Sequence, residues 1–247
     1  MAQYRGVAKR EGGGKQRENH DCETIDTSWS FQGAQSVPRP GLLVVRATDS
    51  IEPRTHSLAM RPNEIQITNP DWVASMVDYS SRYTDDDARV RLAVQLAREN
   101  VLRGSGGPFG AAVFDETGRL VAVGTNGVMR LKNSSAHAEI VAIAMAQAAV
   151  GSFTLQNDGQ PRHELFSSCE PCAMCLGATL WSGVTRVVFS ATREDATRSG
   201  FDEGPVFADS YRYLENRGIA IERGRLRSEG AAVLRLYVER GGPIYNP

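Results

Sequence analysis

The sequence predicts a three-layer α/β/α sandwich with a mixed central sheet of about five strands. From residue 63 onward, short apolar runs alternate with segments of helical periodicity. The first two apolar runs are joined by Asp115-Glu-Thr-Gly118, which is a hairpin signal. Strands that alternate with helices are typical of layered α/β domains. Hydrophobic residues make up 41% of the chain, enough to fill a core of this size.

The first regular element is a helix over residues 88–102, because apolar residues recur there at helical spacing behind the acidic run Asp85-Asp-Asp87. Gly106-Gly-Pro-Phe-Gly110 separates this helix from two strands, over residues 111–114 and 120–123. A second helix is predicted over residues 137–150, closed by Gly151.

The second half of the chain continues the alternation. A strand over residues 164–168 leads to a helix over residues 171–181, with proline in its first turn, and then to a strand over residues 186–190. A weaker continuation follows. It comprises a helix over 211–216, a strand over 219–222 and a helix over 231–239.

Residues 1–62 differ from the rest, being rich in Gly, Arg, Ser, Thr and Pro. We expect a flexible N-terminal extension there, with one apolar run, Gly41-Leu-Leu-Val-Val45, that could form a lone strand. Met60 is an alternative start of the chain. The domain that carries the chemistry is predicted to span residues 63–247.

Net charge and composition indicate which kinds of ligand and cellular environment suit the protein. The formal net charge is −1, without the basic surplus typical of nucleic-acid-binding proteins, so a small neutral ligand is favoured over RNA or DNA. No apolar stretch approaches the roughly 18–20 residues needed to span a bilayer, and no signal peptide is evident. Three of the four cysteines lie within seven residues, which suits a metal better than a disulfide framework. We therefore expect a cytoplasmic protein without a membrane partner.

Two short motifs form the candidate metal site: His137-Ala-Glu139 and Pro171-Cys-Ala-Met-Cys175. Each falls at the predicted N-terminus of a helix, where the helix dipole favours anions such as thiolates. His137, Cys172 and Cys175 supply three zinc ligands and leave the fourth tetrahedral position open, as in catalytic zinc sites. The sequence therefore predicts one Zn²⁺ per chain.

The spacing of the cysteines also fits other kinds of site. An isolated C-x-x-C motif also occurs in structural zinc knuckles and redox pairs. With Cys169 the run becomes C-x2-C-x2-C, which resembles part of an iron–sulfur motif, but no fourth cysteine is suitably placed. We expect Cys169 to be a small buried residue beside the site.

The combination of H-A-E with P-C-x-x-C resembles the signature of zinc-dependent deaminases of the cytidine-deaminase superfamily. This resemblance implies the cytidine-deaminase-like fold and hydrolytic deamination. Glu139 follows His137 by two residues, so it does not share a helical face with it as a ligand. Glu139 is better placed to take a proton from the water and return it to the ring and the departing amine.

Within that superfamily the chain looks like the guanine-deaminase branch. The matching stretch runs from Gly106 to Pro205, and Gly200-Phe-Asp-Glu203 is its discriminating segment. The resemblance implies that Glu203 is a second carboxylate that holds the substrate and helps to move protons. It also implies substrate contacts from several other residues: Phe109 and Trp181 stacking on the ring beside His137, Asn126 at the purine edge, Ala138, Asp202, and Tyr245 in a tail that closes the pocket.

Guanine, converted to xanthine and ammonia, is the expected substrate. Cytidine, an aminotriazine such as ammeline, and adenosine in tRNA are alternatives, as is a catalytically silent partner subunit. The family resemblance also implies a homodimer whose C-terminal tails are swapped in some relatives. The exact ring and the pathway are not determined by the sequence.

Overall fold

The computed structural model describes residues 63–156, 159 and 161–245. Five strands form one sheet in the order β2-β1-β3-β4-β5. They are β1 (Gly110–Asp115), β2 (Leu120–Thr125), β3 (His163–Cys169), β4 (Arg186–Ala191) and β5 (Ala220–Glu222). β1 pairs antiparallel with β2 and β3, whereas β3, β4 and β5 are parallel. The predicted mixed sheet and its hairpin are confirmed.

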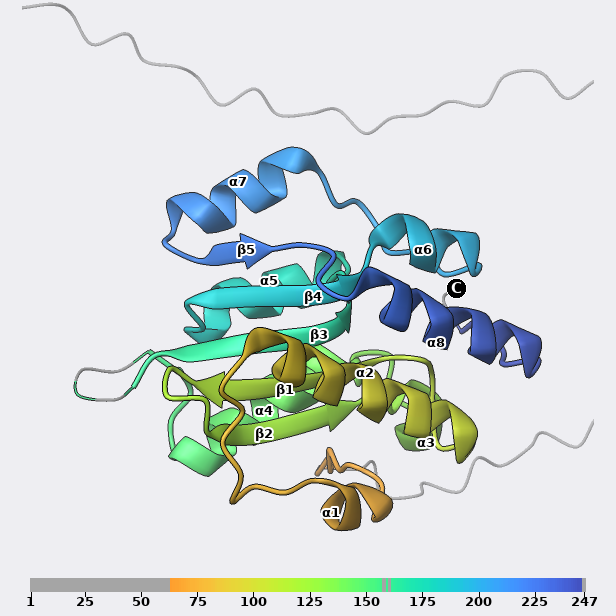
Figure 1. The fold of residues 1–247 in the computed structure, drawn as a ribbon, viewed down its shortest axis with the longest axis horizontal. Coiled ribbons are helices and arrows are strands. Elements are labelled where there is room, and N and C mark those ends of the chain that lie inside the picture. Colours follow the sequence, from red (N-terminus) through yellow and green to blue (C-terminus); the bar gives the residue numbers. More distant parts are fainter. Residues whose placement is uncertain (1–62, 157–158, 160, 246–247) are drawn as a thin grey trace, which may run out of the picture. The chain divides into compact units, whose positions relative to one another are not determined.

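Helices cover both faces of this sheet (Figure 1). On one side α2 (Asp86–Leu102) packs against β1 and β3, and α8 (Arg227–Glu239) packs against β4. On the other side α4 (Ala138–Val150) packs against β1 and β2, and α5 (Ala173–Ser182) contacts α4. α7 (Ala208–Asn216) lies beside β5. The predicted three-layer α/β/α sandwich is confirmed.

Three short helices had not been predicted. They are α1 (Trp72–Met76), α3 (Val128–Leu131) and α6 (Arg193–Arg198). Each spans at most six residues, too few for a hydrophobic period to emerge from the sequence. No helix of the described residues is both long and apolar enough to cross a membrane. The predicted extension over residues 1–62 and the alternative start at Met60 lie outside the described residues and stay predictions.

β1 and β4 are buried on both faces over nearly their whole length, which explains their mostly apolar sequences. Alternate residues of β1 enter two separate cores. Ala112 and Phe114 join the core under α2 and α8, while Ala111 and Val113 join the core under α4. The pleat of a strand accounts for this division, since successive side chains point to opposite faces.

A glycine in β2 sets how closely α4 approaches the sheet. A Cβ atom on Gly124 would lie 2.1 Å from the carbonyl oxygen of Ala138 and 2.4 Å from the amide of Ala142. Any side chain would therefore push α4 away from β2. Because Ala138 is the first residue of α4, this close approach places the N-terminus of the helix, and His137 before it, against the sheet.

A capping box begins α6 and ties it to α8. Asp195 Oδ2 accepts hydrogen bonds from the amide and hydroxyl of Thr192, at 3.0 and 3.1 Å. The guanidinium of Arg227 binds the same carboxylate through two donors, at 2.8 and 3.1 Å. These bonds, led by that of Arg227, lower the pKa of Asp195 to about 2. The charged form of Asp195 therefore stabilises the fold.

Asp195→Asn should lower the free energy of unfolding at pH 7 by about 1 kcal/mol, the typical cost of a lost helix cap. Because the native pKa is lowered from 3.8 to about 2, the difference from wild type should persist down to about pH 4 and shrink below it. Urea unfolding at pH 7, 4 and 3 measures this. Asp209→Asn is the control, since the ion pair of Asp209 with Arg212 is exposed to solvent and should contribute little to stability. An equal loss in both variants would contradict the assignment.

Candidate active site

Three metal donors meet where α4 and α5 begin. His137 is the N-cap residue of α4, Cys172 is the N-cap residue of α5, and Cys175 lies in the first turn of α5. Their donor atoms all lie within 4.8 Å of one another. His137 Nδ1 is 3.5 Å from Cys172 Sγ and 3.6 Å from Cys175 Sγ. Tetrahedral zinc, with Zn–N of about 2.0–2.1 Å and Zn–S of about 2.3 Å, requires about 3.6 Å between such ligands.

The charges of the site also favour a metal ion. The thiol of Cys175 donates to Cys172 and lowers the pKa of Cys172 to about 4, with a further contribution from His137 that offsets burial. Two carboxylates, Glu139 and Glu203, lie in the same cavity. None of the described residues that line this cavity is a lysine or arginine. A divalent cation would supply the positive charge that these buried anions need.

Glu139 is held deep in the site by hydrogen bonds. It is 5% exposed, and its Oε1 accepts a hydrogen bond of 3.1 Å from the hydroxyl of Ser167 on β3. The thiol of Cys175 lies 3.5 Å from Oε2. Burial, followed by the charge of Cys172, raises the pKa of Glu139. A carboxylate whose proton affinity is raised in this way is suited to accept a proton and release it again.

The second carboxylate belongs to the loop between α6 and α7. The backbone carbonyl of Glu203 accepts a hydrogen bond of 3.0 Å from the amide of Ala173, the first residue of α5. This bond brings Glu203 beside Cys172. Burial is the main cause that raises the pKa of Glu203 to about 8, and the charges of Cys172 and Glu139 add to it.

These side chains enclose a cavity of about 20 Å³. Eight residues line it: Phe109, His137, Glu139, Glu170, Cys172, Phe201, Glu203 and Tyr245. The rings of Phe109 and Phe201 meet edge to face at 5.0 Å, and those of Phe201 and Tyr245 at 5.5 Å. A cavity of this size holds about one water molecule. A larger ligand therefore requires one wall to move.

Two polar atoms near the cavity lack partners. Among the described residues, Asn126 Nδ2 and the hydroxyl of Tyr245 are the buried side-chain atoms without a hydrogen bond. Asn126 is otherwise well held, since its Oδ1 accepts from the amide of Val128 and its backbone carbonyl accepts from Asn100. A buried donor without a protein partner is available to a ligand or a water molecule.

The C-terminal tail forms one wall of the cavity. The Tyr237 hydroxyl donates to the carbonyl of Pro243 at 2.7 Å, and the amide of Gly242 donates to Tyr237 at 2.9 Å. Tyr245 then packs over Gly107, where a Cβ atom would lie 2.2 Å from the tyrosine hydroxyl. The tail thus covers the cavity of its own chain, and only a glycine at position 107 leaves room for it.

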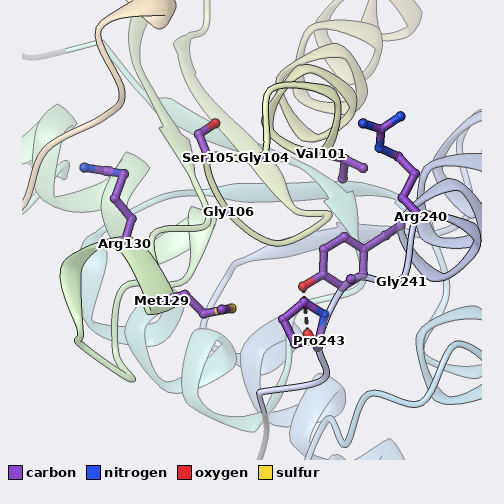
Figure 2. A pocket seen from close by; sticks show the side chains of 11 residues that line it. Val101, Gly104, Ser105, Gly106, Met129, Arg130, Arg240, Gly241 and Pro243 are labelled. Atoms are coloured by element: carbon purple, nitrogen blue, oxygen red, sulfur yellow. Dashed lines mark hydrogen bonds between the residues drawn. The ribbon is translucent and has the colours of Figure 1, made fainter.

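On the outer side of the tail lies a second, larger pocket of about 580 Å³ (Figure 2). Its lining includes Gly241 and Pro243 of the tail, the loop at Gly104, and α3. Arg130 and Arg240 lie on opposite sides of it in Figure 2.

Three of the expected substrate contacts, those of Trp181, Asp202 and Ala138, are not among the residues that line the cavity. Trp181 lies six residues beyond Cys175, about 9 Å further along α5, and is 76% exposed. It is not among the residues that line the cavity of its own chain, so its stacking on the ring has no support there and stays a prediction. Asp202 is exposed and accepts a hydrogen bond from the amide of Gly204. Ala138 is fully buried in the core under α4.

Two residues of the cavity were missed in the sequence. Glu170 stands between Cys169 and the P-C-x-x-C motif, and Phe201 lies within Gly200-Phe-Asp-Glu203. Their positions inside the motifs were the available signal. Cys169 is buried, stays outside the cluster of metal donors and faces the carbonyl of Thr192 at 3.9 Å.

Comparison with known proteins agrees with this geometry. Residues 83–191 match the cytidine and deoxycytidylate deaminase zinc-binding region. The chain is 38% identical over 130 residues to the guanine deaminase of Bacillus subtilis, which covers 53% of this chain and 80% of that protein. The solved structure of the guanine deaminase from Nitrosomonas europaea has a TM-score of 0.68 at 39% identity, covering 72% of this chain and 97% of that one. A tRNA-specific adenosine deaminase of Buchnera aphidicola is 31% identical over 128 residues, 51% of this chain and 77% of that protein.

The chain belongs to the zinc-binding deaminases of the cytidine and deoxycytidylate deaminase family. Within that family, the two guanine deaminases are more similar to it than this tRNA-specific deaminase is.

The metal site can be tested with two neighbouring cysteines. Wild-type protein should contain about one zinc ion per chain by mass spectrometry of the metal, and Cys172→Ala should lose most of it, because two donors remain. Cys169→Ala is the matched control and should retain the metal. Full occupancy in Cys172→Ala would contradict the assignment.

The tail can be tested through Tyr245. Tyr245→Ala should leave the melting temperature nearly unchanged but raise KM, because the cavity would no longer close over a ligand. Removal of Gly241–Pro247 should have the same effect, more strongly. Thermal unfolding reports a role of the tail in stability, and steady-state kinetics report a role in closing the cavity. Unchanged kinetics after the deletion would contradict the closing role.

Proposed function

We propose that this protein is a hydrolytic nucleobase deaminase that converts guanine and water to xanthine and ammonia. The observation that carries this proposal is the composition of the site. Three metal donors cluster beside a cavity that the carboxylates of Glu139 and Glu203 line together with aromatic side chains. The similarity to guanine deaminases supports the choice of ring.

Recognition of the ring falls to three kinds of side chain. Asn126 has a free amide donor for an acceptor on the purine edge. With the metal cation bound, which favours its charged form, Glu203 offers carboxylate oxygens to ring N–H groups, and each charge-assisted bond of this kind contributes about 1.5–3 kcal/mol. Phe109 and Phe201, whose rings contact each other, supply apolar surface in the same cavity as the polar groups. Together they favour a flat, uncharged ring with both donors and acceptors.

Glu139 moves the protons. One Zn²⁺ held by His137, Cys172 and Cys175 would supply the Lewis acidity that makes water a nucleophile at neutral pH. Glu139 accepts one proton from the water and delivers it to the ring nitrogen. It then takes the proton of the hydroxyl group that the water has left on the carbon and delivers it to the amine, so that the C=O bond forms and ammonia leaves. Ser167 keeps the carboxylate aimed at the reacting atoms. Tyr245 and the tail exclude solvent during the reaction.

The alternative substrates and functions are less well supported. A tRNA substrate would have to enter a cavity covered by the tail, and the net charge of −1 gives little attraction for RNA. A catalytically silent subunit would lack a donor or the glutamate, and all of them are present. Cytidine and an aminotriazine such as ammeline are the substrates against which guanine must be compared.

Purified protein should release ammonia from guanine with a kcat/KM well above that for cytidine, adenosine, ammeline or tRNA. Glu139→Gln should retain zinc and fold but lose at least 10²–10⁴-fold in kcat, the usual contribution of a general acid–base group. Glu203→Gln should lower kcat/KM for guanine without changing zinc content. Turnover of ammeline or cytidine but not guanine would overturn the choice of substrate.

We also propose a homodimer. α4 and α5 present an apolar hollow of about 380 Å³ on the surface, lined by Ile140, Ile143, Ala144, Gln147, Phe153, Ala178, Trp181 and Ser182. Phe153 and Trp181 are 88% and 76% exposed. Large apolar side chains gathered in this way are typical of protein interfaces. Swapping of the tails and a cytoplasmic location, which would keep the metal-binding thiols reduced, stay predictions.

Light scattering should give twice the mass of one chain for wild type. Trp181→Glu should give a monomer, because a charge would be buried in the interface. Tyr213→Glu, a change at an exposed aromatic on α7, is the control and should leave the dimer intact. A monomeric wild type would contradict the proposal.

A further inference from the structure

Glu170 is a buried carboxylate in the wall of the cavity to which neither the motifs nor the proposed reaction assigns a role. It follows β3 directly, stands two residues before Cys172 and is 8% exposed. Its backbone amide donates to the carbonyl of Ala191 on β4, at 2.8 Å. A buried carboxylate is costly unless its oxygens are hydrogen-bonded, so its partners indicate what it does.

Both oxygens of Glu170 bind groups from distant parts of the chain. Oε1 accepts a hydrogen bond from the hydroxyl of Tyr211 on α7. Oε2 accepts from the backbone amide of Arg193, the first residue of α6, at 2.9 Å. The guanidinium of Arg223 lies 3.8 Å above the ring of Tyr211 and 4.0 Å from Oε1. With both oxygens engaged, Glu170 is oriented toward the protein rather than toward a substrate.

The two hydrogen bonds bracket the loop that carries Glu203. Arg193 begins α6 before this loop, and Tyr211 lies in α7 after it. The side chain of Arg193 also donates to the carbonyl of Val206, which closes the loop on itself. The carbonyl of Glu203 accepts from the amide of Ala173, the residue after Cys172.

We propose that Glu170 is a positioning residue that fixes the Glu203 loop and the turn bearing Cys172 relative to each other. Its backbone holds that turn against β4 while its carboxylate anchors both flanks of the loop. Loss of one anchor lets Glu203 shift away from the cavity and loosens Cys172 as a metal donor. The part that concerns Glu203 rests on the proposed function, and the part that concerns Cys172 does not.

The first experiment measures zinc affinity in the absence of substrate, by competition between the protein and a chelating dye. Glu170→Gln should weaken zinc binding by about 10–100-fold, as expected when a partner that orients a metal ligand is lost. Glu215→Gln, an exposed carboxylate on α7, is the control and should bind zinc like wild type. Equal zinc affinity in Glu170→Gln and wild type would overturn the link to Cys172.

The second arm is a double-mutant cycle on guanine deamination. Tyr211→Phe removes one donor to Glu170 with little change in volume, and should lower kcat/KM by on the order of tenfold in the wild-type background. In a Glu203→Gln background the same change should cost less than about twofold, because the residue it positions is already disabled. Tyr213→Phe, two residues away and exposed, should have no effect in either background.

Equal losses from Tyr211→Phe in both backgrounds, or a lower melting temperature with unchanged kcat/KM, would show a merely structural role and overturn the coupling to Glu203. Failure of wild type to deaminate guanine would instead count against the proposed function. The zinc competition would still decide whether Glu170 supports Cys172.

Discussion

On one face of the sheet, α4 and α5 begin so close together that the imidazole of His137 lies 3.5 and 3.6 Å from the thiols of Cys172 and Cys175. This convergence of helix N-termini depends on the missing side chain of Gly124, which lets α4 settle against β2. The other parts of the site follow from it. Glu139 lies in the first turn of α4, and Ala173, at the start of α5, binds the loop of Glu203.

The same convergence creates an electrostatic problem. Three carboxylates and a thiolate surround a cavity that no lysine or arginine of the described chain lines. Hydrogen bonds stabilise part of this buried negative charge: Ser167 binds Glu139, and Tyr211 and the amide of Arg193 bind Glu170. The pKa values of Glu139 and Glu203 are raised, in each case mainly by burial, so the protein alone does not fully stabilise their charged forms. A divalent cation between the three donors resolves it, and it also provides the chemistry of the proposed reaction.

Local signals in the sequence were enough for the sheet, the long helices and the metal donors. Apolar runs, a hairpin turn and two cysteines spaced three residues apart can each be recognised within a short stretch of sequence. Residues whose positions depend on contacts between distant segments could not be predicted in this way. Trp181 was expected at the ring because of the family resemblance, yet it lies near the end of α5, is 76% exposed and does not line the cavity of its own chain. Glu170, in contrast, lines the cavity although no role was predicted for it. Its hydrogen-bond partners lie 23 and 41 positions further along the chain, so no local pattern marks it.

X-ray absorption at the zinc edge tests the central claim most directly, because it reports the atoms bound to the metal. The account predicts two sulfur atoms at about 2.3 Å and two lighter atoms at about 2.0–2.1 Å, one from His137 and one exchangeable from solvent or ligand. Guanine or an unreactive purine should change the lighter-atom shell and leave the sulfur shell intact. Three or four sulfur atoms, or a shell that does not respond to any ligand, would indicate a closed structural site and contradict the account.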